Sequence, residues 1–253
     1  MKFTSHPILK GPTPEEIKKL CFNSDGSTKP EGLKALIEMH RLHEDAVANA
    51  DADPLHFGVS LESWEYADDM LENYDTLMIF GGNRSSKTEY GARSVVKAAI
   101  ENAGSIIVCF AQDADASIRT QQSAVYRYLP PSFKQKTKGV LEYLNYTVKN
   151  GFTGQSFILP NGSQVLFHTY SQFIANRSKF EGLELGSKTP EWHNIGLWPD
   201  EYLEDGDLIR TMRFRLATRD AKMVLTFTPI DGYTPFVAEF LKGAETRKTR
   251  KAP

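Results

Sequence analysis

The residues best suited to chemistry form one short string with the spacing G-x-x-x-x-G-K-[ST], except that serine stands at the second glycine position. The string is Gly81, Gly82, Asn83, Arg84, Ser85, Ser86, Lys87 and Thr88. Glycines let backbone N–H groups wrap closely around a phosphate, lysine adds a mobile positive charge, and a threonine hydroxyl can bind Mg²⁺. The string therefore predicts a phosphate-binding loop, with a chance polar turn before a surface helix as the alternative.

Four positions of this loop carry most of its expected chemistry. Lys87 is expected to reach the β- and γ-phosphates of a nucleotide, and Thr88 to bind Mg²⁺. Arg84 lies inside the loop and is placed beside the phosphates by the motif itself. Ser86 is the departure from the usual pattern. If this position needs a positive φ, serine costs about 1 kcal/mol relative to glycine and could reshape the loop.

Two adjacent acids follow the apolar segment 194–198 and supply what triphosphate hydrolysis needs besides the loop. Asp200 is expected to hold Mg²⁺ through a water molecule, and Glu201 to orient or deprotonate the attacking water. Pro199 is unusual so near a strand end, but proline is acceptable where ladder pairing finishes. The alternative is a solvated acidic loop, because further acids follow at Glu204, Asp205 and Asp207.

Hydroxyls and arginines supply further candidates. Thr226 lies at the end of the segment 222–227 and Thr228 directly follows it, and both could sense the γ-phosphate from a neighbouring strand tip. Threonines favoured in strands by β-branching are the alternative. Arginines can stabilise the charge on the γ-oxygens during phosphoryl transfer. Besides Arg84, the candidates are Arg119, Arg127, Arg213 and Arg215, and a solvated or ion-paired role is the simpler interpretation of each.

The elements that must position these residues alternate between strands and helices. A short apolar strand, 76–80, precedes the loop, and a helix, 88–102, follows it. Strands are also expected at 105–110, 147–148, 156–159, 164–168, 194–198 and 222–227, and a helix at 114–128. The strands 156–159 and 164–168 form a hairpin across a Pro-Asn-Gly turn. The alternation predicts an α/β fold with a mainly parallel sheet covered on both faces.

The order of these elements predicts a P-loop NTPase. About 110 residues separate Lys87 from Asp200, which leaves room for an intervening strand. This spacing fits the additional-strand, RecA-like class. We expect a helical region at 1–55, with a helix starting at Pro14 after a Thr13 cap and another at 30–50. The ATPase domain is expected at 56–241, beginning with an amphipathic helix at 60–73, and a basic linker or tail at 242–253.

Composition and charge restrict the function less than the motifs do. The chain has 253 residues, mean hydropathy −0.40, two cysteines, and no apolar run long enough to span a membrane. Neither the two cysteines nor the six histidines form a metal pattern. Residues 1–75 carry 7 Lys and Arg against 15 Asp and Glu, whereas residues 76–253 carry 23 against 17. This asymmetry permits a polyanionic partner for the larger part of the chain without requiring one.

Taken together, these segments resemble the ATPase domain of bacteriophage terminase large subunits, the motors that package DNA into capsids. The loop is one residue from a common terminase form of the Walker A motif, including its internal arginine. The resemblance covers about residues 55–240. It rests on an ordered set of motifs: the loop, Lys179-Phe180-Glu181-Gly182-Leu183, Asp200-Glu201, Met212-Arg213-Phe214-Arg215, and Thr226-Phe227-Thr228-Pro229.

The resemblance implies roles for these positions. Asp200 would be the Walker B acid, Glu201 the catalytic glutamate, and Thr226–Thr228 a coupling motif. Adenine would lie against the segment 57–64. An arginine finger acting in trans would come from Arg119, Arg213 or Arg215. The implied ligands are ATP and Mg²⁺.

The same resemblance implies partners and a setting. The partners are double-stranded DNA, the portal protein and the small terminase subunit, with a homo-oligomeric ring on the procapsid and no membrane. The location would be the cytoplasm of an infected bacterial cell. The acids of a nuclease domain are not found in this chain, so we expect an ATPase domain without nuclease activity. A host helicase-like translocase, a nucleotide-gated assembly module with little turnover, and a structural protein with a coincidental motif remain alternatives.

Overall fold

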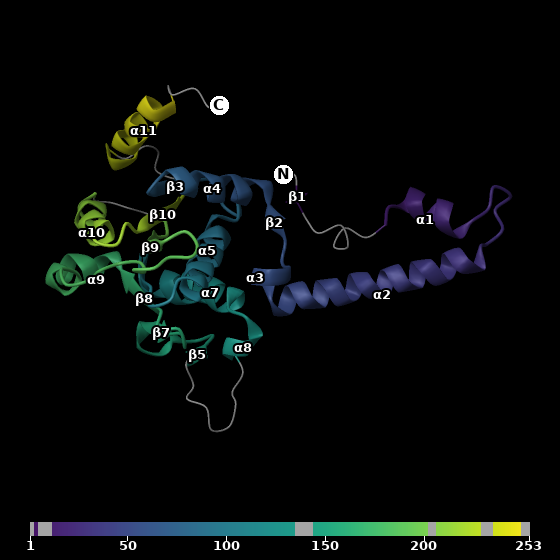
Figure 1. Cartoon of the computed structure of the whole chain (residues 1–253), viewed down its shortest axis with the longest axis horizontal. Coiled ribbons are helices and arrows are strands. Elements are labelled where there is room, and N and C mark those ends of the chain that lie inside the picture. The colour runs from purple at the N-terminus through teal and green to yellow at the C-terminus, as the bar shows by residue number, and fades with distance from the viewer. Residues whose placement is uncertain (1–2, 5–11, 135–143, 202–205, 229–234, 249–253) are drawn as a thin grey trace. The chain divides into compact units, whose positions relative to one another are not determined.

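A computed structural model describes residues 3–4, 12–134, 144–201, 206–228 and 235–248 of the chain (Figure 1). The chain divides into two compact units. The first comprises residues Met1–Asp68 and Arg127–Gln135, and the second comprises Asp69–Tyr126 and Lys136–Pro253. The division at Asp68 falls later than the domain start expected at residue 56, and it lies within one helix, α4 (Glu62–Asn73).

The first unit is built on a helical hairpin. Its elements are β1 (Phe3–Thr4), α1 (Pro14–Cys21), α2 (Pro30–Ala52), α3 (Pro54–Phe57), β2 (Ser60–Leu61) and α8 (Pro131–Lys134). Helix α1 begins as the sequence predicts, with Pro14 in the first turn and a capping box between Thr13 and Glu16. A Cβ atom added at Gly32 of α2 would lie 1.9 Å from the Leu20 carbonyl oxygen, so glycine is what lets α1 and α2 approach.

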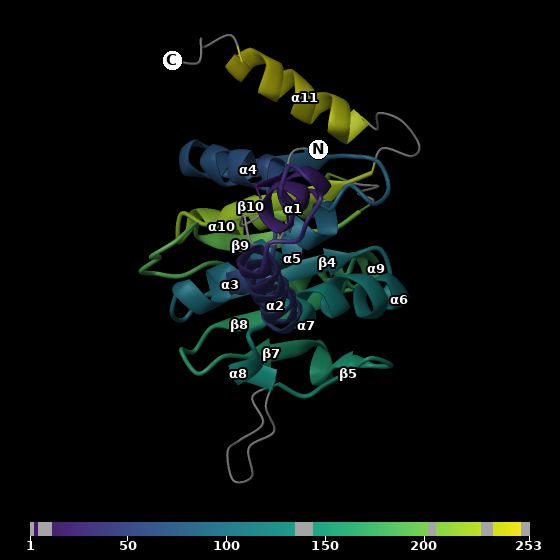
Figure 2. The same ribbon diagram turned by 90° about the vertical axis from the view of Figure 1, so that its right-hand side faces the viewer.

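The second unit contains a six-stranded sheet with the order β3-β10-β9-β4-β8-β7. The strands are β3 (Thr76–Phe80), β4 (Ile106–Ala111), β7 (Ser156–Ile158), β8 (Gln164–Thr169), β9 (Ile195–Pro199) and β10 (Lys222–Phe227). All neighbouring pairs are parallel except the predicted β7–β8 hairpin. Figure 2 shows β10, β9, β8 and β7 stacked one below another.

The strand order confirms the class of α/β fold that the sequence predicts. Strand β10 pairs with β3 on one side and with β9 on the other, so it is interposed between the loop strand and the strand that carries the two acids. Because these strands are parallel, their carboxyl ends meet at one edge of the sheet, where ligands bind in open α/β folds. The segments expected to do chemistry therefore share one edge.

Helices cover the sheet of this unit. They are α5 (Lys87–Glu101), α6 (Ala114–Ala116), a π-helical turn (Ser117–Gln122), α7 (Ser123–Tyr128), α9 (Tyr170–Ala175), α10 (Asp207–Ala217) and α11 (Pro235–Lys248), with 3₁₀ turns at Thr153–Gln155 and Arg177–Phe180. One buried cluster joins Ile209 and Met212 of α10 to Leu197 and Leu225 of the sheet. This packing fixes the strands that carry the candidate site.

Some sequence-based boundaries differ from the structure. Residues Ser60–Leu61 pair with Phe3–Thr4, so the helix expected at 60–73 begins only at Glu62. The strand expected at 147–148 is Tyr146–Thr147 and pairs with Gly151–Phe152 in a separate small sheet. Residues 242–248, expected in a linker or tail, continue α11, and no proline or glycine follows Gly243 within this helix. Residues 249–253 of that expected tail lie outside the described residues.

No helix within the described ranges is long and apolar enough to cross a membrane. Both cysteines are buried and free, Cys21 in the first unit and Cys109 in the second.

Candidate nucleotide-binding site

The predicted phosphate-binding loop connects β3, which ends at Phe80, to α5, which begins at Lys87. Ser86 has a φ of 62°, so this position does adopt the left-handed conformation that usually selects glycine. Arg84 has the same φ of 62°. A Cβ atom added at Gly81 would lie 2.3 Å from the Ser85 hydroxyl oxygen. The loop is therefore tightly wound, and its strain is concentrated at two residues that are not glycine.

Lys87 brings this loop close to Glu201, one of the two acids that follow β9. Its side chain is buried, and its ammonium group donates hydrogen bonds to the Gly82 carbonyl oxygen at 3.0 Å and the Ser85 hydroxyl at 3.3 Å. The same nitrogen lies 4.0 Å from Oε1 of Glu201. A buried ammonium group at the centre of the loop is suited to bind phosphate oxygens, because it has three donors and no acceptor.

Asp200 is buried at the carboxyl end of β9 and is surrounded by hydroxyl groups. The Thr226 hydroxyl donates to Oδ1 at 2.5 Å, and the Thr88 hydroxyl lies 3.3 Å from both carboxylate oxygens. Burial raises the pKa of Asp200 from 3.8 to about 6, although the hydrogen bond from Thr226 acts in the opposite direction. A nearby divalent metal ion would offset this cost by favouring the ionised carboxylate.

Glu201 follows directly and adopts a left-handed backbone conformation with φ 57°. Its N–H donates to the Thr226 carbonyl oxygen at 2.8 Å. Its carboxylate accepts from the Thr228 N–H at 3.1 Å and from the Thr228 hydroxyl at 2.7 Å. Strand β10 and the residue directly after it thus contact the two acids: Thr226 of β10 binds Asp200, and Thr228 binds Glu201. Pro229, which follows these threonines in the motif shared with terminases, lies outside the described residues.

Two side chains at this site have no motif that would identify them from sequence. The Tyr170 hydroxyl lies 3.3 Å from the Asp200 carbonyl oxygen and 3.0 Å from that of Glu201, to which it donates. Burial raises the pKa of Tyr170 well above its usual value, so it remains a donor. Trp198, two residues before Asp200, is buried and donates its indole N–H to the Thr226 hydroxyl. Their only signal in the sequence is position at the carboxyl ends of predicted strands.

The residues present fit a nucleotide with Mg²⁺. A cavity of about 220 Å³ is lined by residues 83–89 and by Glu201. Thr88 and Asp200 bring a hydroxyl and a carboxylate oxygen to one point, and Mg²⁺ prefers oxygen ligands of this kind. The loop lies at the N-terminus of α5, where the helix dipole favours an anion. Phosphate, cation and acid sites therefore adjoin one another.

The arginines proposed to act in trans are not among the residues that line this cavity. Arg119 is exposed and forms an ion pair with Asp115 at 2.7 Å. Arg213 is exposed on α10, whereas Arg215 is half-buried. Arg84 is the exposed arginine that the loop itself contributes. The assignment of an arginine finger stays a prediction, and so does adenine binding by residues 57–64.

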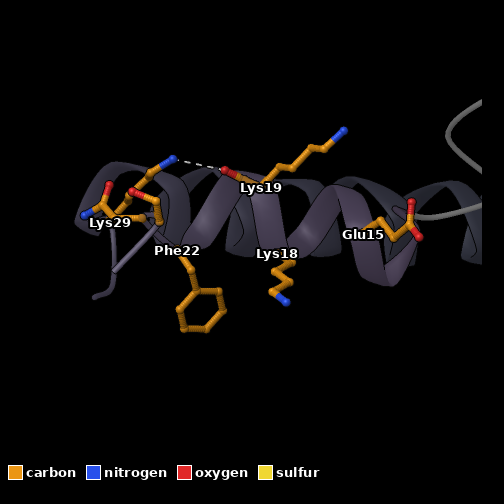
Figure 3. Close-up of a pocket in the computed structure, with 7 residues that line it drawn as sticks. Glu15, Lys18, Lys19, Phe22 and Lys29 are labelled. Atoms are coloured by element: carbon orange, nitrogen blue, oxygen red, sulfur yellow. Dashed lines mark hydrogen bonds between the residues drawn. The ribbon is translucent and has the colours of Figure 1, made fainter. Parts of the chain in front are cut away.

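A second cavity, of about 430 Å³, lies beside α1 in the first unit and is lined by Glu15, Lys18, Lys19, Phe22, Asn23, Ser24 and Lys29. Figure 3 shows that Lys18 and Lys19 project from different sides of the helix, and that Glu15 lies at the far end. Lys29 donates to the Lys19 carbonyl oxygen at 3.1 Å. These charged groups do not converge on a common point, so the cavity lacks the arrangement of a built anion site.

The fold and the site define an α/β protein of the P-loop, RecA-like architecture, with an additional strand between the loop strand and the acidic strand. Comparison with known families makes the assignment more specific. Residues 78–252 match the family described as terminase large subunit, T4likevirus-type, N-terminal. The chain belongs to this family, and it is a viral packaging terminase protein. None of the curated protein sequences compared with the chain matches it.

Proposed function

We propose that this chain is the Mg²⁺-dependent ATPase motor of a DNA-packaging terminase. One observation carries the proposal: the loop and the acidic strand, far apart in sequence, meet at side-chain distance. The Thr88 hydroxyl lies 3.3 Å from the Asp200 carboxylate, and the Lys87 ammonium lies 4.0 Å from the Glu201 carboxylate. A phosphate-binding group, a metal-binding pair and a candidate base are therefore adjacent, as triphosphate hydrolysis requires.

In this proposal the loop binds and orients the triphosphate. The residues of the loop are Gly81, Gly82, Asn83, Arg84, Ser85, Ser86, Lys87 and Thr88. Their backbone N–H groups surround phosphate oxygens, and Lys87 exchanges its contacts with Gly82 and Ser85 for the β- and γ-phosphates. Arg84 is exposed beside the cavity and can reach the γ-phosphate oxygens, on which charge accumulates. Mg²⁺ held by Thr88 and Asp200 would neutralise part of that charge.

Glu201 acts as the general base. It accepts two hydrogen bonds from Thr228, and a carboxylate offers about four acceptor positions, so capacity remains to orient and deprotonate a water. Because Thr226 of β10 and Thr228 directly after it contact the two acids, a displacement of either carboxylate during turnover is transmitted to this strand. We propose this strand as the coupling element between hydrolysis and motion.

The work performed is translocation of double-stranded DNA into a procapsid, which is supported by membership of the terminase family. The proposed partners are the portal protein, the small terminase subunit and further copies of this chain in a ring. A neighbouring copy would supply Arg119, Arg213 or Arg215 as a finger. Binding to DNA phosphates would be sensitive to salt. The proposed location is the cytoplasm of the infected cell.

Phosphate release from Mg·ATP, measured with and without double-stranded DNA, tests the proposal. Glu201→Ala is expected to abolish turnover and to leave calorimetric ATP binding intact, because the residue acts on water rather than on the phosphates. Glu44→Gln, at an exposed position on α2 outside the cavity, serves as the control. Unchanged turnover in Glu201→Ala would refute the assigned mechanism.

A nucleotide-gated assembly module is a second candidate, favoured by the strained φ of Ser86 and of Glu201. Such a module would bind ATP and change its assembly with little turnover. Stoichiometric ATP binding without phosphate release, in the presence of DNA and procapsids, would select this candidate. Strand separation without packaging would select a helicase-like translocase instead.

A further inference from the structure

Trp198 is a fully buried side chain that the proposed chemistry does not use. It lies on β9, two residues before Asp200, and its indole nitrogen lies 2.8 Å from the Thr226 hydroxyl oxygen. That hydroxyl lies in turn 2.5 Å from Oδ1 of Asp200. The three groups form a buried series of two hydrogen bonds that ends on the carboxylate assigned to Mg²⁺.

The donor and acceptor in each of these two hydrogen bonds follow from the chemistry of the groups. An indole N–H can only donate, so the Thr226 oxygen must accept from Trp198. A hydroxyl has one proton, and its nearest remaining acceptor is Oδ1 of Asp200. Because the indole N–H occupies the Thr226 oxygen as a donor, the Thr226 hydroxyl proton is directed to Asp200. With Oδ1 held in this way, Oδ2 is the carboxylate oxygen left to a cation beside the Thr88 hydroxyl, which lies 3.3 Å from it and is assigned to the same cation.

The indole is itself held by the helix that follows the loop. A Cβ atom added at Gly91 of α5 would lie 2.2 to 2.5 Å from three atoms of the Trp198 ring. Only a residue without a side chain allows the ring to lie this close to the helix. Trp198 therefore contacts α5, which carries Lys87 and Thr88, and β10, which carries Thr226.

We propose that Trp198 is a positioning residue for magnesium binding. It orients the Thr226 hydroxyl, which fixes the Asp200 carboxylate with one oxygen directed to the cation. This inference rests on the proposed function, because it concerns the same metal site. It adds a residue that neither the motif nor the family assignment identifies. It also assigns that residue to magnesium binding and not to binding of the nucleotide itself.

The test compares calorimetric ATP binding in Mg²⁺ with ATP binding in EDTA, for the unmodified protein and for a set of variants. In Mg²⁺, Trp198→Phe and Thr226→Val are expected to weaken binding by about 10- to 100-fold, the usual effect of losing a residue that orients a metal ligand. In EDTA their affinities should match that of the unmodified protein. Thr226→Ser, which keeps the hydroxyl, should retain the magnesium-dependent affinity. The double variant should be no weaker than either single one, because both act through one chain of hydrogen bonds.

Trp192→Phe is the matched control, because Trp192 contacts Lys97 at a distance of 4.5 Å from its ring centre and does not line the cavity. The indole N–H resonance provides a second measurement that does not depend on Trp198→Phe folding. In Thr226→Val the Trp198 resonance should move upfield, while those of Trp64 and Trp192 keep their positions.

The outcomes separate this inference from the proposed function. Equal magnesium-dependent affinity in the unmodified protein and Thr226→Val would overturn the inference alone. A parallel loss of affinity in Mg²⁺ and EDTA would also overturn it, since that pattern indicates packing rather than positioning. If the unmodified protein binds ATP no better in Mg²⁺ than in EDTA, the proposed function fails and the inference fails with it.

Discussion

Replacing Asp200 by asparagine is expected to stabilise the protein without metal while removing its magnesium chemistry. The Asp200 carboxyl is buried, and burial raises its pKa from 3.8 to about 6. A shift of this size corresponds to about 3 kcal/mol by which ionisation favours the unfolded state. Asparagine has a similar shape, still accepts from Thr226 and Thr88 through its carbonyl oxygen, and carries no charge to desolvate.

The sign of the pH dependence follows from the direction of the shift. Because the folded pKa is the higher one, the folded state binds more protons between pH 3.8 and about 6. The contribution of Asp200 to stability is therefore fully present below pH 3.8 and is lost as pH rises through about 6. The stabilisation of Asp200→Asn over the unmodified protein should be small near pH 4. It should approach about 3 kcal/mol above pH 7 as an upper value, since the new amide N–H₂ group also needs partners.

Urea unfolding in EDTA at pH 4.5, 6 and 7.5 measures this difference as a shift of the midpoint. Asp115→Asn is the exposed control, and its stability should change by less than about 0.5 kcal/mol at every pH. Added Mg²⁺ should then stabilise the unmodified protein and not Asp200→Asn, because binding to the folded state alone is stabilising. A stability difference that is independent of pH, or a loss of stability at pH 7.5, would refute the reasoning.

Two further predictions concern the backbone of the site. Ser86→Gly should raise the free energy of unfolding by about 1 kcal/mol, measured in urea, because φ is 62° and the serine side chain makes no capping hydrogen bond. If the free energy of unfolding does not rise, serine has no energetic cost at this position. Tyr170→Phe should lower kcat for ATP more than it changes KM, because it releases the carbonyl oxygens of Asp200 and Glu201. The loss of this buried hydrogen bond should also lower the free energy of unfolding by about 1–3 kcal/mol. An unchanged kcat would show that Tyr170 contributes only to packing.

Much of the architecture could be predicted from local patterns. The boundaries of β3 and β10 agree with the expected strands 76–80 and 222–227, because short apolar runs between breaks have few other conformations in an α/β chain. The turn at residues 160–162 correctly joins a hairpin. The start of α4 was wrong by two residues, because Ser60–Leu61 pair with a strand near the N-terminus, and such a long-range pairing leaves no local pattern.

The candidate site was predictable to a different extent. The loop residues are neighbours of one another in the chain, and so are the two acids. The spacing within each group therefore marks it as a candidate from sequence. The sequence left open whether Ser86 needs a positive φ, and the structure shows that it has one. Glu201 also has a positive φ, although no motif requires it there. Thr226 and Thr228 were candidates for contact with the γ-phosphate. Their observed partners are the two carboxylates, and contact with a nucleotide stays a prediction.

The sequence by itself determined the α/β class and the position, between a strand and a helix, of the loop that is predicted to bind phosphate. These features depend on residues that are neighbours in the chain. Only the tertiary structure decided how the acids are held. The parallel bridge between Asp200 and Thr226 sets the register of β10 against β9, and that register brings Thr226 to Asp200 and Thr228 to Glu201. Gly91 and Trp198 also meet only through folding. Such contacts depend on strand order and packing, which local spacing does not encode.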